Sequence, residues 1–499
     1  MKLKKFGVSP DLLYLCSEIM ESLKEKTAKG LFWGGMNNGV QQLLGLAFGI
    51  ILGRLLDPSD YGMTAMLAVF SVIANELQSS GFKTGLINMK EPRHDDYNAV
   101  FWFNILVGAA IYVVLFFSAP LIANYYHQPA LIPLSRYVFL GFVFSSFGMA
   151  QSAYLTKQLQ IKQIAKCGMT ATLTSSIVCV VLAALGFGYW ALATQYLLYI
   201  AVNTILLWYF SPWRPTLKVT FEPIRQLFPF SFKIMLSAIF TQINNNIMNL
   251  LLGRYYGETN TGHYNQAYQW SSKCFLLVGN MLKQVDQTVL VGLHDERERQ
   301  LAVLRKMMRF TAFISFPLLF GLGLVSHEFI VLAIGEKWAF SASLLPLLCL
   351  CGAFMPLSTL LTDSIISQHR SDIYLWNTLV LGVIQIVLMV SLCRQGIYVM
   401  VIGYTILNIA WMFVWHFFTR RLMRYSLLHF MKDIIPFALA AAAVMLVTGF
   451  ATQMISILWL KLLCRVVLAV VLYYGIMRLS GAVILKECID FIKGRKNQS

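Results

Sequence analysis

Charged side chains are scarce in this chain: Asp, Glu, Lys and Arg make up 13% of its 499 residues, while apolar residues make up 58%. Soluble domains contain about a quarter charged residues and about half apolar ones. A water-soluble globule would have to leave many of these apolar side chains in contact with water. The composition therefore excludes a soluble protein and indicates a membrane protein.

The apolar runs lack the alternation of polar and apolar side chains that is typical of barrel strands. They recur from Leu31 to Leu479, and each run of about 20 residues can cross about 30 Å of hydrocarbon as a helix. In lipid, helices also satisfy their own backbone hydrogen bonds. The sequence therefore predicts an all-α membrane protein with about 14 transmembrane helices.

The predicted spans fall into groups. They lie at 32–53, 61–82, 98–119, 134–155, 167–186 and 189–210, then at 229–252, 264–288, 310–333, 342–366, 372–392 and 397–418, and finally at 433–451 and 457–479. We therefore predict a cytoplasmic segment at 1–30, an N-lobe of six spans at 31–210, a cytoplasmic linker at 211–228, a C-lobe of six spans at 229–420, two further spans at 430–480 and a basic cytoplasmic tail at 481–499.

The two groups of six resemble each other in sequence. LGRLLDPSDYG at 52–62 is echoed by LGRYYGETNTG at 252–262, an offset of about 200 residues. Gln42 and Gln242 keep the same register. An internally duplicated bundle explains this pattern, and such bundles commonly bind their substrate between the repeats.

The segment at 1–30 has two interpretations. Its residues 10–29 mix apolar and charged side chains at helical spacing, as an amphipathic helix at the membrane surface does. Alternatively, translation starts at Met20 and the preceding residues are an upstream extension.

Acidic residues are fewer than basic ones, 23 against 40, which gives a formal net charge of +17. A strongly basic chain can bind nucleic acid, but here the positions of the charges argue otherwise. If the N-terminus is cytoplasmic and each span crosses once, roughly 30 of the 40 basic residues fall in inside loops and tails. The charge therefore indicates orientation, with both termini cytoplasmic, and predicts no nucleic-acid partner.

Motifs for catalysis and metal binding are missing from the sequence. The eight histidines are dispersed, and there is no H-E-x-x-H, Walker A or G-x-S-x-G pattern. The nine cysteines are scattered, mostly in apolar runs, and predict neither disulfides nor a metal site. The outside loops are too short for the catalytic loop of a polymerising enzyme. We predict a protein that is not an enzyme and needs no cofactor.

Basic side chains within apolar spans are candidates for binding. An ionisable group at the bilayer centre costs about 2.5–3.5 kcal/mol on insertion scales, so its presence indicates a structural or functional role. Arg54 and Arg254 lie at matching span ends, and Lys273 and Arg465 lie inside spans. Guanidinium groups bind phosphate bidentately, and an ammonium group binds it as a point charge, so Arg54, Arg254 and Lys273 suit a phosphate-bearing substrate. Alternatively, the two arginines pair with acids in the adjoining loops or cap helix ends.

Amide side chains cluster in the first and seventh spans, which correspond in the repeat. They include Asn38 and Gln42 in the first span and Gln242 and Asn245 in the seventh. Amides that face a cavity hydrogen-bond sugar hydroxyls, whereas the same groups can instead join helices. Because consecutive amides cannot all face one neighbouring helix, we predict that these four bind substrate.

Two acids within spans are candidates for ion coupling. Glu76 lies in the second span, and Asp286 lies near the inner end of the eighth. Glu76 either binds a proton or cation or pairs with Lys273 or Lys83. The sequence leaves this choice open.

Several segments carry a resemblance to a known family. They are LGRLLDPSDYGMTAM at 52–66, VFWFN at 100–104, GYWALATQ at 188–195, GRYYGETNTGHYNQAYQ at 253–269 and IGEKW at 334–338. These segments resemble the polysaccharide flippase branch, the Wzx-like proteins, of the multidrug/oligosaccharidyl-lipid/polysaccharide exporter superfamily. Asp286 departs from the apolar residue that the resemblance leads us to expect there.

The resemblance implies two six-helix lobes around a central cavity, two additional C-terminal helices and a location in the bacterial inner membrane. It implies alternating access that moves an undecaprenyl-diphosphate-linked oligosaccharide outward for an O-antigen, a capsule or an exopolysaccharide. The partners implied are this lipid-linked oligosaccharide diphosphate, membrane lipids and, functionally, a polysaccharide polymerase, with a monomer as the transport unit. The alternatives are a cation-coupled multidrug exporter of the same superfamily and a membrane glycosyltransferase or ligase.

Overall fold

The computed structural model describes residues 39–79, 82–217, 222–283, 296–368, 370–481 and 484–485. Across these residues the chain is helical, and no strand occurs among them. The predicted all-α fold class is confirmed for this part of the chain. The predicted segment at 1–30 and the tail from residue 486 onward lie outside the described residues.

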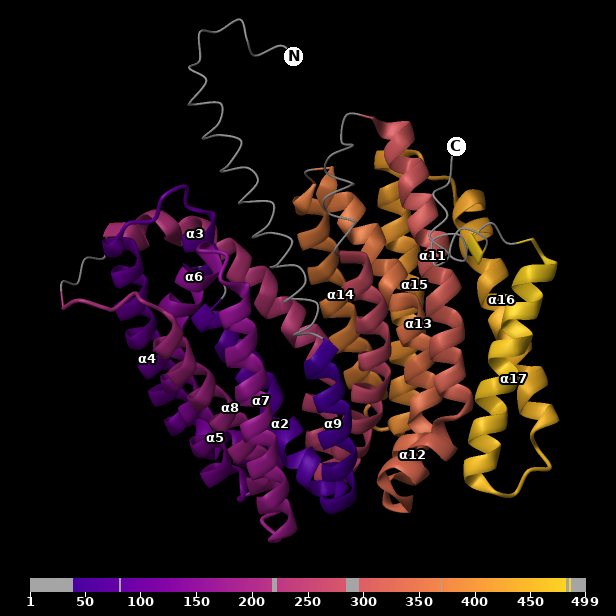
Figure 1. Cartoon of the computed structure of the whole chain (residues 1–499), viewed down its shortest axis with the longest axis horizontal. Coiled ribbons are helices and arrows are strands. Elements are labelled where there is room, and N and C mark those ends of the chain that lie inside the picture. Colours follow the sequence, from indigo (N-terminus) through magenta and orange to yellow (C-terminus); the bar gives the residue numbers. More distant parts are fainter. Residues whose placement is uncertain are drawn as a thin grey trace, which may run out of the picture. The chain divides into compact units, whose positions relative to one another are not determined.

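Figure 1 shows the helices coloured in their order along the chain. The first half of the chain forms a helix at Gly39–Leu55, then α2 (Pro58–Ser79), α3 (Phe82–Asn88), α4 (His94–Tyr126), α5 (Leu131–Ser146), α6 (Met149–Lys157), α7 (Ile161–Ala184) and α8 (Tyr189–Phe210). The second half forms α9 (Glu222–Lys283), α11 (Arg297–Leu324), α12 (Ser326–Ile334), the 3₁₀ turn η2 (Glu336–Trp338), α13 (Ala339–Ser367), α14 (Ser371–Leu392), α15 (Ile397–Met423), α16 (Leu427–Ala451) and α17 (Leu458–Leu479).

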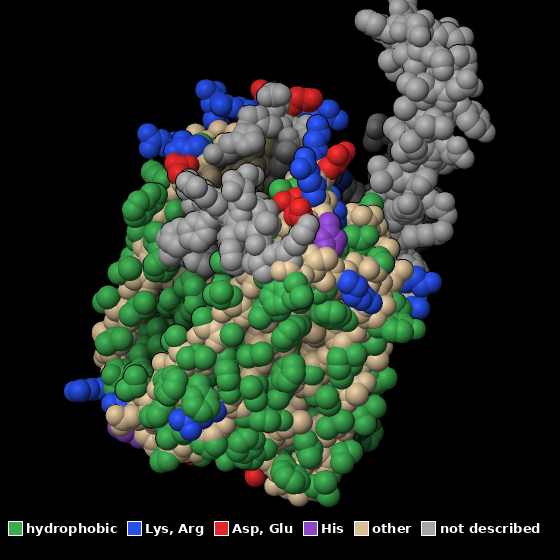
Figure 2. All heavy atoms as spheres, turned by 90° about the vertical axis from the view of Figure 1, so that its left-hand side faces the viewer, with side chains coloured by type: hydrophobic (Ala, Val, Ile, Leu, Met, Phe, Trp, Pro, Cys, Tyr) green, Lys and Arg blue, Asp and Glu red, His purple; other side chains and the backbone are tan. Residues whose placement is uncertain are grey.

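Most of these helices suit a membrane. Within the described residues, nine are long and apolar enough to cross one, and the bent pair α5 and α6 is a further candidate. Large apolar side chains point outward: Phe117 is 73% exposed and Tyr209 is 76% exposed. Figure 2 shows hydrophobic side chains over most of one face, with charged side chains gathered towards its upper edge. Such a surface is stable in lipid, so the protein is a multi-pass membrane protein.

The chain forms two compact units. Unit 1 comprises residues 1–56 and 70–242, and unit 2 comprises residues 57–69 and 243–499. In unit 1, α4 packs against α5, and α7 packs against α8. In unit 2, α13 packs against α11 and α15, and α16 packs against α11 and α17. The first turns of α2 thus belong to unit 2, while its last turns belong to unit 1.

Two predicted spans are interrupted in the structure. The span at 134–155 forms α5 and α6, which are bent by 44°. The hydroxyls of Ser145 and Ser146, next to this break, donate to the carbonyl oxygens three residues earlier. Such bonds, together with a neighbouring glycine, bend helices. The span at 310–333 divides between α11 and α12 at Val325.

Residues predicted as two spans, at 229–252 and 264–288, form the single element α9. Its backbone is broken at Gly257, where φ is 78° and ψ is 179°. Glycine adopts this conformation at little cost, whereas a side chain there would be strained. Gly257 therefore turns the chain between the two halves of α9.

Candidate functional site

Two of the predicted site residues contact each other in unit 1. Gln242 donates through Nε2 to Glu76 Oε1 at 3.0 Å, and both side chains are half-buried. The bond joins the later turns of α2 to α9. A carboxylate that accepts from an amide keeps further lone pairs for a proton or a cation.

The neighbouring amides of α9 divide into two groups. Asn244 donates through Nδ2 to the Thr378 carbonyl oxygen at 3.2 Å, and the backbone oxygen of Asn244 accepts from Gln385 Nε2 at 2.7 Å. A Cβ atom at Gly382 would lie 2.2 Å from Asn244 Oδ1, so glycine permits this approach. Asn244 therefore joins α9 to α14, whereas Asn245 is exposed.

The predicted cationic residues lie in different surroundings. Arg54 is exposed in the helix Gly39–Leu55, Arg254 is half-buried in α9, and neither is without a partner. The ammonium of Lys273 lies 4.3 Å from the centre of the Trp270 ring. A cation over an aromatic face keeps a favourable contact away from water.

The remaining predicted site residues are placed as follows. Gln42 is exposed in the helix Gly39–Leu55. Gln42, Arg54, Glu76 and Gln242 belong to unit 1, and Asn245, Arg254 and Lys273 belong to unit 2. Asn38 and Asp286 lie outside the described residues. In the part of the chain that the structure describes, no three His, Cys, Asp or Glu side chains come together to hold a metal ion.

A buried carboxylate fastens α12 to α17. Glu328 is 2% exposed, and Arg465 Nη1 lies 2.8 Å from each of its carboxylate oxygens. Lys461 Nζ lies 3.4 Å from the same group. Arg465 also donates to the Leu324 carbonyl oxygen at 2.9 Å and to Thr452 Oγ1 at 3.1 Å. Two cations therefore share one acid at this position.

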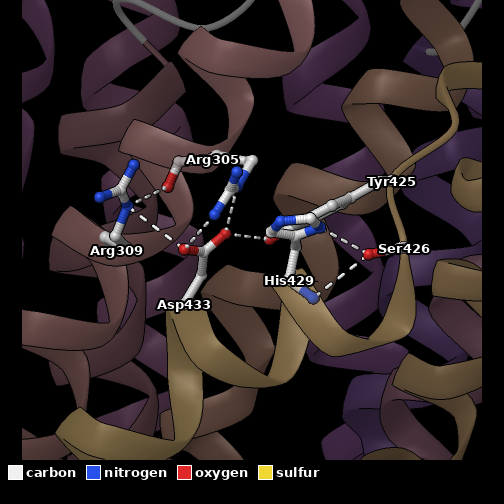
Figure 3. A network of polar contacts seen from close by, with 6 residues as sticks. All are labelled: Arg305, Arg309, Tyr425, Ser426, His429 and Asp433. Carbon is white, nitrogen blue, oxygen red and sulfur yellow. Dashed lines mark hydrogen bonds and ion pairs between the residues drawn. The ribbon is translucent and has the colours of Figure 1, made fainter.

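A second buried carboxylate fastens α16 to α11 (Figure 3). Arg305 donates to both oxygens of Asp433, at 2.7 and 3.1 Å, and Arg309 Nε lies 3.4 Å from Oδ1. The Tyr425 hydroxyl donates to Asp433 at 2.9 Å. Burial and the adjacent carboxylate raise the pKa of Tyr425, so this hydroxyl remains a donor. Ser426 caps α16 by accepting from the His429 backbone N–H at 3.3 Å.

An apolar cavity of about 560 Å³ lies among α11, α16 and α17. Phe313 and Pro317 of α11, Met445 of α16 and Val470 of α17 contribute to its walls. Arg465 is the charged residue among the described side chains that line it. The cavity therefore suits an apolar chain rather than a sugar.

Sequence patterns did not identify Glu328 or Asp433. They did identify Arg465 as an ionisable residue inside a span, which implies a buried partner. Glu328 lies in the predicted span at 310–333 and was therefore available as that partner. The pair could not be predicted, because Glu328 and Arg465 are 137 residues apart in the sequence.

Comparison with known families shows the family of this chain. A family model described as "Polysaccharide biosynthesis protein" matches residues 51–343, more than half of the chain. The chain belongs to this polysaccharide biosynthesis family. The lipopolysaccharide biosynthesis protein WzxC of Escherichia coli (strain K12) is 28% identical over 358 residues, which cover 70% of this chain and 72% of WzxC.

This family member shares its fold with solved transporters. The lipid II flippase MurJ, in an inward closed conformation, aligns with a TM-score of 0.71 at 13% identity, over 90% of this chain and 99% of MurJ. An inward-facing multidrug resistance MATE family transporter of the MOP superfamily aligns with a TM-score of 0.62 at 15% identity, over 77% of this chain and 96% of the transporter. The chain therefore has the fold of these membrane transporters, and the predicted family is confirmed.

Proposed function

We propose that this protein flips an undecaprenyl-diphosphate-linked oligosaccharide across the bacterial inner membrane for the synthesis of a surface polysaccharide. The observation that carries the proposal is the combination of family and fold. The chain belongs to a polysaccharide biosynthesis family, and its fold matches that of a lipid II flippase over 90% of its length. A substrate with a long apolar tail and a polar head needs such a protein, because its charges cannot cross hydrocarbon unaided.

The predicted binding residues supply the groups that this substrate requires. Arg54, Arg254 and Lys273 bind the diphosphate in this proposal, and Asn38, Gln42, Gln242 and Asn245 bind the sugars. The exposed amides of Gln42 and Asn245 support this role, since they differ in exposure from Asn244, which joins helices. The apolar cavity among α11, α16 and α17 accepts part of the polyprenyl tail.

The proposed transporter works by alternating access. Two six-helix lobes surround a central cavity, two further helices complete about 14 spans, and both termini are cytoplasmic. Glu76 and Asp286 are the proposed ion-coupling residues. The transport unit is a monomer that supplies substrate to a polysaccharide polymerase.

A cation-coupled multidrug exporter is the second candidate. The fold likeness to a MATE family transporter and the half-buried carboxylate of Glu76 favour it. The family match at residues 51–343 favours the polysaccharide function instead.

The test measures where the lipid-linked oligosaccharide lies in cells that lack both this protein and the polymerase. A sugar-specific probe confined to the outer face of the inner membrane reports the flipped substrate. Wild-type protein should restore the outside signal, and Arg54→Ala combined with Arg254→Ala should restore much less. Arg394→Ala, which removes an exposed arginine two residues after α14, is the matched control and should behave as wild type.

Each result of this test has a distinct meaning. An unchanged outside signal in cells without the protein, and without a redundant flippase, would contradict the proposed function and favour the drug exporter. Full activity of the double arginine variant would contradict the diphosphate site alone.

A further inference from the structure

The acid Asp433 and its basic neighbours lie where the charged ends of α11 and α16 give way to apolar sequence. After Arg309, α11 carries no further charged residue up to its end at Leu324, and after Asp433, α16 carries none up to Ala451. Charged side chains at the end of an apolar membrane helix lie at the level of the lipid headgroups. The cluster around Asp433 therefore lies at one surface of the membrane.

Positive charge is in excess in this cluster. Arg305, Arg309 and Lys432 carry three positive charges, and Asp433, which both arginines contact, carries one negative charge. These four residues therefore have a net charge of +2. The Asp433 carboxylate is buried, whereas Lys432 is exposed and the Arg309 side chain is 38% exposed. The excess charge is thus accessible from the membrane surface.

Arg309 keeps hydrogen-bond donors that the protein does not use. Its Nε donates to the Arg305 carbonyl oxygen at 3.4 Å and lies 3.4 Å from Asp433 Oδ1. In the part of the chain that the structure describes, no hydrogen bond or ion pair engages its two terminal nitrogens, and Figure 3 shows them pointing away from Asp433. A guanidinium group binds a phosphate through two parallel N–H groups. The terminal nitrogens of Arg309 are therefore available for a phosphate.

Lys432 lies on an exposed stripe of α16. The stripe repeats every three or four residues and so follows one face of the helix, and its members are Leu428, Lys432, Ile435 and Leu439. The three apolar members are 68%, 38% and 64% exposed, and Lys432 is also exposed. Within the described residues, the Lys432 ammonium makes no hydrogen bond or ion pair. An acyl chain can lie along this stripe while Lys432 extends to a phosphate at its end.

We propose that Arg309 and Lys432 bind the phosphate of an anionic phospholipid whose acyl chains lie along the exposed stripe of α16. The occupant is a bilayer lipid because the site joins cationic groups at the membrane surface to an apolar helix face. It is an anionic lipid because the net charge of +2 repels the ammonium group of a zwitterionic headgroup. The site shares no residue with the diphosphate site proposed at Arg54, Arg254 and Lys273.

Lipid binding is measured by native mass spectrometry on the purified full-length protein in detergent, with phosphatidylglycerol and phosphatidylcholine of the same acyl chains as probes. Wild-type protein should bind phosphatidylglycerol more tightly. Lys432→Gln should weaken this binding about fivefold and Arg309→Gln with Lys432→Gln about 30-fold, as expected for one and two basic residues at the headgroup level. Lys166→Gln with Arg394→Gln removes two exposed cations elsewhere and, as the charge-matched control, should bind as wild type.

Two results would overturn the site directly. They are equal binding of the two lipids by wild-type protein, and a loss in the control equal to that in the double variant. Arg305 still contacts Asp433 in the double variant, so we expect it to fold, and its unfolding temperature without lipid checks this. Lys432→Gln breaks no contact among the described residues, so its result remains decisive if the double variant unfolds.

Undecaprenyl diphosphate, as a further probe, distinguishes a phospholipid from the proposed substrate. The double variant should bind undecaprenyl diphosphate as well as wild type does. Loss of this binding with unchanged phosphatidylglycerol binding would overturn the phospholipid site and assign the two cations to the substrate instead. Because none of these measurements requires flipping, failure of the phospholipid site is distinguishable from failure of the proposed function.

Discussion

Unit 2 holds its helices together in two different ways. Glu328 and Asp433 are each 2% exposed, and each is bound by two cations that fasten α16 and α17 to α11 and α12. At the crossing of α2 with α9, glycines meet backbone and the ion pair lies at the surface. The clusters at Glu328 and Asp433 bury charge, whereas the crossing of α2 with α9 does not.

This difference determines which contact can open. Separating a buried ion pair leaves a charge without a partner, at a cost of about 3–5 kcal/mol. Separating an exposed pair costs less than about 1 kcal/mol. We therefore expect α11, α12, α16 and α17 to move as one body, while the first turns of α2 can separate from α9.

The largest effect is expected from Glu328→Ala. Arg465 and Lys461 are only 12% and 23% exposed, so both would be left largely buried without an acid. The free energy of unfolding should fall by about 3–5 kcal/mol, measured by thermal unfolding in nanodiscs. Glu336→Ala, at an exposed acid in η2, is the control. Equal unfolding temperatures for Glu328→Ala and wild type would contradict the buried-charge account.

A smaller effect is expected from changes at Asp433. Arg305 and Arg309 are 28% and 38% exposed, so water can hydrate them in part when the acid is lost. Asp433→Ala should cost about 2–3 kcal/mol, and Tyr425→Phe about 1–2 kcal/mol, in the same unfolding measurement. A loss at Asp433 greater than that at Glu328 would reverse the ranking of the two clusters.

The amides of α9 should separate stability from transport. Asn244→Ala should lower the free energy of unfolding by about 1 kcal/mol, because the bond from α9 to α14 is lost. Asn245→Ala should leave unfolding unchanged and reduce flipping. An Asn245 variant with normal flipping would remove this residue from the proposed sugar site.

The smallest effect on stability is expected at the exposed ion pair between Asp57 and Lys337. Asp57→Ala or Lys337→Ala should change the free energy of unfolding by less than about 1 kcal/mol, yet increase amide exchange at 57–62. The double variant Asp57→Lys with Lys337→Asp should bring exchange back towards wild type. Failure of this charge reversal to restore protection would show that the pair contributes nothing to the stability of this contact.

Sequence patterns located the helices well where the hydrocarbon thickness sets the length of an apolar run. The span predicted at 189–210 coincides with α8, and that predicted at 457–479 begins one residue before α17. They failed at the break between α5 and α6, because serine hydroxyls and a glycine bend a run that remains apolar throughout.

The candidate site was harder to predict because its contacts join distant parts of the chain. The amide-rich segment of α9 was identified, but not that Asn244 faces α14 or that Gln242 bonds Glu76. Periodicity cannot choose between neighbouring amides when each has a possible partner on another helix. For the same reason, the ion clusters at Glu328 and Asp433 could be identified only from the packing of the helices in the structure.

Reconstitution tests the central claim, the flipping of lipid-linked oligosaccharide, most directly. Purified protein is placed in liposomes that carry a fluorescent undecaprenyl-diphosphate-linked oligosaccharide, and a sugar-cleaving enzyme is added outside. The account predicts that protein makes the inner-leaflet substrate accessible to the enzyme, and that protein carrying both Arg54→Ala and Arg254→Ala does so much less. If liposomes with and without protein expose the same fraction while the protein exports a cationic dye, the protein is a drug exporter and the account is wrong.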